Sequence, residues 1–266
     1  MSRRHLTFSC EGCNLAATLD QADGQTGLLI VSGGNEVRSG PFGSQALIAS
    51  QVANAGYPVF RFDRRGVGDS EGTNGTFEAS GPDITAALAC FREQAPYLRR
   101  VVAFGNCDAA SALAINQGGG FNAMVLANPW TFDPVEVEGD QPPATQMTPQ
   151  RLRAHYLRRL TDPRAWLRLL TGQVRAGSLA SSLKGAAAAD APASRLFSQI
   201  KHGIDSFDGQ TTLLIAQRDR TGLAFLDHWD QSDPRLQLCA HASHSFVEPS
   251  ARAWLLDRLL EALRTA

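Results

Sequence analysis

Short apolar runs recur along the chain, and stretches with helical periodicity separate them. Two runs near the N-terminus alternate polar and apolar residues around a Glu-Gly pair, which predicts a β-hairpin of residues 5–10 and 15–20. The later runs are apolar almost throughout, as is typical of strands buried on both faces of a parallel sheet. They are residues 28–31, 59–62, 101–104, 123–127, 212–216 and, more weakly, 235–239. The helical candidates are residues 44–55, 82–94, 108–117, 223–229 and 249–263. This order predicts an α/β fold with a mostly parallel, eight-stranded sheet and an N-terminal hairpin.

The alternation of strands and helices is interrupted once, after Asn128. About 80 residues follow without a convincing strand, and helical patterns occur at 151–160, 163–170 and 194–200. The pattern therefore predicts a helical cap, residues 130–207, inserted into a core formed by residues 1–129 and 208–266.

Charge is balanced over the whole chain but not within the predicted cap. The chain has 25 basic and 26 acidic residues, a net charge of −1, which argues against a dedicated nucleic-acid binder. Residues 151–201 contain ten basic and two acidic residues, and Arg151, Arg158 and Arg159 are among the basic ones. We expect these arginines to bind an anionic part of a substrate, although a solvated helical face explains the same charge equally well.

No apolar stretch approaches the roughly 20 residues of a membrane helix, and the N-terminus lacks the apolar block of a secretion signal. The five cysteines are an odd number, which favours free thiols in a reducing compartment. We therefore expect a cytoplasmic protein that does not span a membrane.

A candidate nucleophile follows the strand at 101–104. The segment Gly105-Asn106-Cys107-Asp108-Ala109 places a cysteine between a strand and a helical pattern, with small residues two positions to either side. A nucleophile on a strained strand-to-helix turn needs such neighbours because the backbone packs closely there. The positive end of the helix dipole also favours a thiolate. The alternative is an inert cysteine buried at a strand end.

An acid and a base follow in the order that a catalytic triad on this type of sheet uses. Asp219 comes directly after the strand at 212–216, and is preferred to Asp227 and Asp230, which lie further along. One helix and one strand later, His244 lies in a loop before the final helix and is the preferred base over His241.

Acyl transfer also requires hydrogen-bond donors for an oxyanion. The N–H of Asp108, directly after the nucleophile, is one candidate. The loop after the strand at 28–31 offers Gly34 and Asn35, and the sequence leaves open which of the two donates; an ordinary glycine turn is the alternative.

Two other motifs have simpler explanations. The glycine-rich segment Asp63-Arg64-Arg65-Gly66-Val67-Gly68-Asp69-Ser70 lacks the spacing of a phosphate-binding loop, and we interpret it as a structural turn. Cys10 and Cys13 have no second ligand pair at zinc-finger spacing, so we expect two free thiols and no metal site.

Taken together, residues 63–70, the cysteine turn at 105–109, Asp219 and His244 resemble the α/β-hydrolase superfamily over nearly the whole chain. The Ser32-Gly33-Gly34-Asn35 loop and the cysteine turn are most similar to the exosortase A system-associated hydrolase 1 group, which bacteria encode beside exopolysaccharide and protein-sorting genes. The resemblance implies a capped hydrolase without a cofactor. The usual turn of the superfamily is Gly-x-Ser-x-Gly, and this chain departs from it at Cys107 and Ala109. Its cysteine nucleophile is similar to those of dienelactone hydrolases and some thioesterases.

These features predict an acyl hydrolase or acyltransferase that acts on a thioester or activated ester through an acyl-enzyme on Cys107. The expected partner is a small acyl substrate, either free or carried on coenzyme A or an acyl carrier protein. Two alternatives stay open: a lactone or C–C bond hydrolase of the dienelactone-hydrolase type, and a non-catalytic binding protein with a hydrolase fold.

Overall fold

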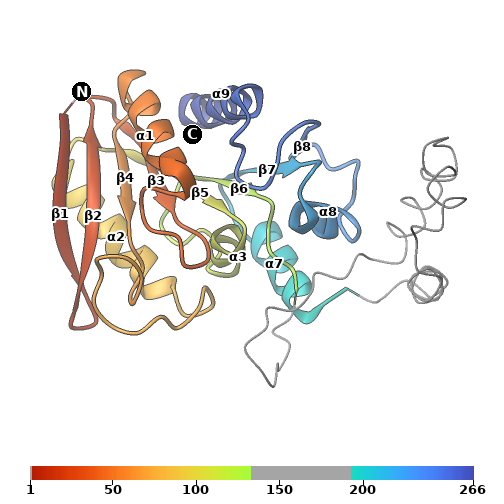
Figure 1. The fold of residues 1–266 in the computed structure, drawn as a ribbon, viewed down its shortest axis with the longest axis horizontal. Helices are drawn as coiled ribbons and strands as arrows, with labels where there is room; N and C mark the ends of the chain where they lie inside the picture. Colours follow the sequence, from red (N-terminus) through yellow and green to blue (C-terminus); the bar gives the residue numbers. More distant parts are fainter. Residues whose placement is uncertain (1, 133–192) are drawn as a thin grey trace, which may run out of the picture.

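A computed structural model describes residues 2–132 and 193–266 of the chain, and one eight-stranded sheet forms its centre (Figure 1). The order of the strands across the sheet is β1-β2-β4-β3-β5-β6-β7-β8. The strands are β1 (Ser2–Cys10), β2 (Cys13–Gln21), β3 (Thr26–Val31), β4 (Val59–Phe62), β5 (Arg100–Asn106), β6 (Ala123–Ala127), β7 (Gln210–Ala216) and β8 (Leu236–Cys239). All eight predicted strands are present, so the predicted fold class is confirmed.

The N-terminal hairpin is the antiparallel part of the sheet. β1 and β2 pair without interruption from Ser2 opposite Gln21 to Cys10 opposite Cys13. The two turn residues, Glu11 and Gly12, have positive φ angles of 47° and 82°, as a two-residue hairpin turn with right-handed strand twist requires. β2 is also antiparallel to β4, and the remaining neighbours pair in parallel.

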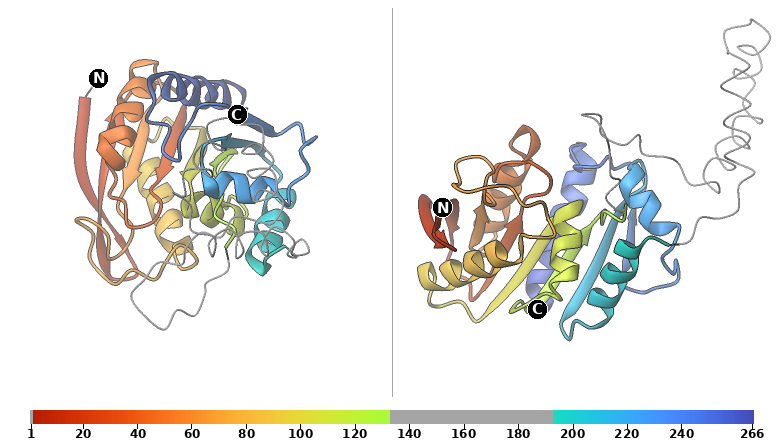
Figure 2. Two further views of the ribbon diagram at one scale, coloured as in Figure 1. Left: turned by 45° about the vertical axis from the view of Figure 1, so that its right-hand side comes forward. Right: turned by 90° about the horizontal axis from the view of Figure 1, so that it is seen from below.

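Helices cover both faces of the sheet. They are α1 (Ser44–Asn54), α2 (Gly81–Gln94), α3 (Asp108–Ile115), α7 (Arg195–Asp205), α8 (Arg220–Leu226) and α9 (Pro249–Thr265), with a short 3₁₀ helix η1 (Pro41–Gly43) before α1. α1 and α9 lie on one side of the sheet, and α2, α3 and α7 lie on the other (Figure 2). In the described part of the chain, no helix combines the length and the apolar character that crossing a membrane requires.

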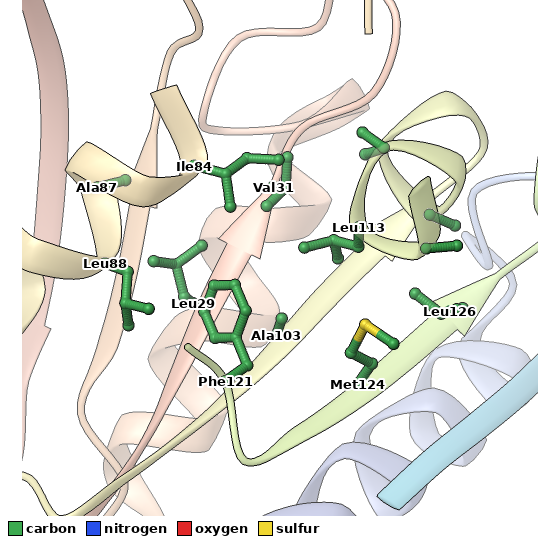
Figure 3. Packing of buried hydrophobic residues seen from close by; sticks show 14 of the residues in the cluster. Leu29, Val31, Ile84, Ala87, Leu88, Ala103, Leu113, Phe121, Met124 and Leu126 are labelled. Carbon is green, nitrogen blue, oxygen red and sulfur yellow. The ribbon is translucent and has the colours of Figure 1, made fainter. Parts of the chain in front are cut away.

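The parallel strands are apolar throughout because each face packs against a helical layer. In β3, Leu29 and Val31 point into the cluster beneath α2 and α3 (Figure 3), whereas Leu28 and Ile30 point into the cluster beneath α1 and α9. This alternation is the two-residue period of a strand acting on two cores at once.

The helix α8 begins earlier than the sequence pattern predicted. Its first residue is Arg220 rather than 223, because the Asp219 side chain accepts a hydrogen bond of 2.9 Å from the Gly222 N–H and so caps the helix. The residue expected to serve as the acid of the triad therefore also starts a helix.

α7 lies within the segment that was predicted to form the cap, and it packs against the core. Its Leu196, Phe197 and Ile200 belong to the same buried cluster as the residues of α3. Ser194 caps α7 by accepting a hydrogen bond from the Phe197 N–H, and its hydroxyl donates to the Thr131 carbonyl. The predicted helices at 151–160 and 163–170 lie outside the described residues, and the division of the chain at 130 and 207 stays a prediction.

The contact between α7 and α3 depends on a glycine. A Cβ atom at Gly203 would lie 1.9 Å from the carbonyl oxygen of Ala114, so a Gly203→Ala substitution must push the two helices apart. We expect it to lower the free energy of unfolding by about 2 kcal/mol, the size of a typical overpacking cost, although alanine is the better helix former.

The measurement is chemical denaturation of this variant beside Gly119→Ala. At Gly119 the added methyl group would meet only the Asn116 carbonyl oxygen, at 3.4 Å, and should be tolerated. Equal stability of the two variants would contradict the close approach of α7 to α3.

Candidate active site

Cys107 lies on the sharp turn between β5 and α3 and has an unusual backbone conformation, φ 63° and ψ −128°. A residue other than glycine is strained in this region of φ/ψ space, so contacts with the surrounding structure must stabilise the turn. The Cys107 N–H donates to the Ala127 carbonyl at 2.9 Å. The Cys107 carbonyl accepts from the Ala110 N–H at 3.1 Å and the Trp130 N–H at 3.3 Å. These bonds fix the turn to β6 and to the first turn of α3.

Small residues around Cys107 allow the neighbouring backbone segments to approach each other closely. A Cβ atom at Gly105 would lie 2.7 Å from the backbone carbon of Ala109, and Ala109 itself is fully buried. On the other side, a Cβ atom at Gly33 would lie 2.6 Å from the Asn106 carbonyl oxygen. Gly105 and Ala109 were expected to be small for this reason, and Gly33 is a third position under the same constraint.

The predicted acid and base meet beside this turn. His244 Nδ1 lies 3.0 Å from Asp219 Oδ2, and the Asp219 side chain is only 8% exposed. The Cys107 thiol also acts on His244 and, like Asp219, favours the charged form of the imidazole. His241 is exposed, and Asp230 lies in an exposed loop beyond α8. The structure thus brings together Cys107, Asp219 and His244.

The surroundings of His244 favour the imidazolium. Burial works against the charged form, but the hydrogen bonds to Asp219 and Cys107, and the electrostatic interaction with both groups, outweigh it. Together they raise the pKa of His244 from 6.5 to about 10. This histidine therefore carries a proton at neutral pH and can donate it to a leaving group.

Two asparagines hold the His244 loop, and the sequence analysis missed both. Asn106 and Asn128 each donate a side-chain N–H to the His244 carbonyl at 3.1 Å. Asn128 also donates to Asn106 Oδ1 at 3.0 Å, and its own Oδ1 accepts from the Ala216 N–H at 2.8 Å. It is fully buried and has a φ of 44°. The available signal was its place directly after an apolar strand, at the sheet edge where parallel strands end together.

The three predicted oxyanion donors lie in the loop after β3 and at the start of α3. The N–H of Gly34 donates to Asp108 Oδ1 at 2.6 Å, so a carboxylate already occupies this donor. Asn35 is exposed, and its side-chain oxygen accepts a hydrogen bond of 2.7 Å from Asn74. Within residues 2–132 and 193–266, the backbone N–H groups of Asp108 and Asn35 have no hydrogen-bond partner.

Two further charged residues reach the site without having been predicted to do so. Arg64, from the turn after β4, donates to the Gly34 carbonyl and lies 3.6 Å from Asp108 Oδ2. Glu36 is half-buried: burial raises its pKa, the neighbouring His244 opposes this shift, and Asp108 adds to it. The turn at 63–70 is structural, as expected, because the Asp63 carboxylate accepts from the N–H groups of Arg38 and Asp69. Its arginine nevertheless extends into the site.

The arginines proposed for substrate binding, Arg151, Arg158 and Arg159, lie outside the described residues. Their role stays a prediction from the charge of the segment.

Comparison with known proteins agrees with this architecture. Residues 28–258 match the family described as the alpha/beta hydrolase family. No curated protein matches the sequence. Among solved structures, an alpha/beta hydrolase, GrgF from Penicillium sp. sh18, is 15% identical with a TM-score of 0.64, covering 100% of this chain and 99% of its own. The esterase Pf2001 of Pyrococcus furiosus is 15% identical with a TM-score of 0.62, covering 99% and 91%.

A third solved structure is the thioesterase domain from the curacin biosynthetic pathway, 14% identical with a TM-score of 0.54, covering 98% of this chain and 100% of that domain. At such low identities these three likenesses concern the fold alone. The family match, by contrast, covers most of the chain, and the protein belongs to the alpha/beta hydrolase family.

Proposed function

We propose that this protein cleaves a thioester or an activated ester through an acyl-enzyme on Cys107, and passes the acyl group to water or to an acceptor. One observation carries the proposal: His244 lies 3.0 Å from Asp219 and also interacts with a cysteine that is held on a strained strand-to-helix turn. Strain of this kind is costly and persists mainly where function requires it.

In the proposed reaction the proton of Cys107 already resides on His244, which Asp219 orients through Nδ1, before the substrate binds. The thiolate attacks the carbonyl carbon of the substrate, and the oxyanion is stabilised by the N–H of Asp108 and an N–H of the Gly34-Asn35 loop. The C–S or C–O bond to the leaving group then breaks, and His244 returns the proton to that group. Water or another acceptor, deprotonated by His244, finally attacks the acyl-enzyme and releases Cys107.

The raised pKa of His244 suits a thiol better than a hydroxyl as the nucleophile. A largely protonated imidazole is a weak base toward a serine hydroxyl, but it forms an ion pair with a thiolate and is ready to protonate a leaving group. The esterase and the thioesterase domain named above support a hydrolase that acts at an acyl carbonyl, through their shared fold.

We also propose what carries the acyl group of the substrate. Because of its cysteine turn, we place the chain with the exosortase A system-associated hydrolase 1 group. We infer that the acyl carrier is anionic, such as coenzyme A or an acyl carrier protein. The excess of basic residues between 151 and 201 supports this inference. The cysteines Cys10, Cys13, Cys90, Cys107 and Cys239 are free thiols, which supports a cytoplasmic location.

Acyl transfer to Cys107 is tested by intact-mass spectrometry after brief incubation with a panel of acyl thioesters. We expect a single acyl adduct on the wild-type protein and none on Cys107→Ala. In His244→Ala the adduct, once formed, should persist at least tenfold longer, because deacylation loses its base.

The matched control is Cys90→Ala, since Cys90 is buried in the core, where burial above all raises its pKa to about 11. This variant should acylate like the wild type. Full turnover of the thioesters by Cys107→Ala would contradict the proposal. A wild-type protein that turns over lactones alone would favour the dienelactone-type alternative. A Cys107 that is alkylated by iodoacetamide no faster than Cys90 would favour the non-catalytic binding protein.

The charge state of His244 is tested by NMR titration of the histidine ring signals, with the His244 signal assigned by its loss in His244→Gln. We expect a midpoint near pH 10 rather than 6.5. In Asp219→Asn, which keeps an oxygen to cap α8, the midpoint should fall by at least one pH unit because the carboxylate no longer stabilises the imidazolium.

The raised pKa of His244 also makes the free energy of unfolding depend on pH. Because the folded pKa lies above the unfolded value, the contribution of His244 to folding is complete below about pH 6.5 and is lost as the pH rises toward 10. If the His244 signal of the wild type titrated with a midpoint close to pH 6.5, Asp219 and Cys107 would not stabilise the imidazolium.

A further inference from the structure

We propose that the Asp108 carboxylate is a positioning residue: with Arg64 it clamps the loop after β3, so that the N–H groups of Asn35 and Asp108, and not that of Gly34, stabilise the oxyanion. This inference rests on the proposed acyl transfer at Cys107 and deepens it. It assigns a role to the side chain of Asp108, of which only the backbone was expected to act.

Three segments meet at this clamp. Asp108 is the first residue of α3, Gly34 belongs to the loop after β3, and Arg64 belongs to the turn after β4. Asp108 Oδ1 accepts from the Gly34 N–H at 2.6 Å, and Arg64 Nη2 lies 3.6 Å from Asp108 Oδ2. The same Arg64 nitrogen donates to the Gly34 carbonyl. Both backbone polar groups of Gly34 are therefore held by charged side chains.

The close approach of the carboxylate to the loop is built into the sequence. A Cβ atom at Gly33 would lie 2.7 Å from Asp108 Oδ1, so only glycine leaves room for the carboxylate there. Gly34 is exposed and has a φ of 56°. A loop with two consecutive glycines has many accessible conformations, and the clamp selects one of them.

The charge of Arg64 makes the clamp difficult to open. The Arg64 side chain is only 4% exposed, and Asp108 supplies its one ion pair within the described residues. Its Nη1 lies buried without a hydrogen-bond partner among those residues. Moving the Asp108 carboxylate away would leave a buried cation without a counter-ion, which is strongly unfavourable.

The clamp affects catalysis through the position of the oxyanion donors. An oxyanion donor is effective only when it already points to the place where the negative charge develops. The Gly34 N–H is held by a carboxylate that a neutral carbonyl oxygen cannot easily displace. The adjacent N–H of Asn35 is free of hydrogen bonds to the described residues, and the clamp fixes its position relative to Cys107.

The opposite interpretation is that the Asp108 carboxylate merely blocks the oxyanion site in the resting protein. The two interpretations predict changes of opposite sign when the carboxylate is removed. A clamp makes acylation slower without Asp108, and a block makes it faster.

The test measures the single-turnover rate of Cys107 acylation by an aryl thioester, together with KM, in the wild type and in Asp108→Ala and Asp108→Asn. We expect Asp108→Ala to lower the acylation rate by 10- to 100-fold with less than a threefold change in KM. Asp108→Asn keeps an oxygen for the Gly34 N–H and should recover about tenfold of that loss. It also preserves the shape of the side chain if Asp108→Ala proves unstable.

Two controls separate this role from a general effect on folding. Alkylation of Cys107 by iodoacetamide forms no oxyanion, so its rate should change less than threefold in both variants. Asp69→Ala removes an exposed carboxylate that pairs with Arg38 in the turn after β4, and it should acylate like the wild type.

The outcomes are distinguishable. If the wild type forms no acyl adduct with any thioester, the proposed function fails and the clamp fails with it. If the wild type is acylated and Asp108→Ala reacts equally fast or faster, only the clamp is overturned. A parallel loss of acylation and alkylation in both Asp108 variants would also overturn it, because it would show a disturbed cysteine rather than a displaced donor.

Discussion

The positive φ of Cys107 is the constraint to which the surrounding structure conforms. This conformation turns the chain from β5 into α3 within one residue, and it requires neighbours that are small or that donate hydrogen bonds to the turn. Gly105 and Ala109 meet the steric requirement, and Gly33 allows the loop after β3 to approach from the other side. The thiol, the first N–H of α3 and the β3 loop are close together because of this one strained residue.

Two ion pairs lie beside the turn. Asp219 compensates the His244 imidazolium on one side, and Asp108 compensates the buried Arg64 on the other. Asn128 holds the histidine loop through an uncharged contact, fully buried and bonded to β7, to Asn106 and to the His244 carbonyl. Orientation of the loop thus relies on neutral groups.

The fold was largely predictable from the sequence because the periodicity of apolar residues reports directly on burial. Uniformly apolar runs identified strands that are covered on both faces, and the meeting of Asp219 with His244 followed from their places at strand ends. The contacts of Asn128 and Asp108 were not predictable. Each joins a side chain to the backbone of a loop far away in sequence, and no local pattern encodes such a pairing. The apolar periodicity places the start of α8 three residues too late, because it does not report the hydrogen bond by which the Asp219 side chain caps the helix.

The hydrogen bond between Ser194 and Thr131 brings together two points that are 63 residues apart in the chain. The described chain therefore leaves the sheet after residue 132 and returns to it at residue 193 at neighbouring points. Because the entropy of closing a loop grows slowly with its length, roughly 0.6 kcal/mol for each doubling, such a junction tolerates large differences in what is attached to it. Insertions and deletions between these two points should therefore cost the sheet and its flanking helices little stability.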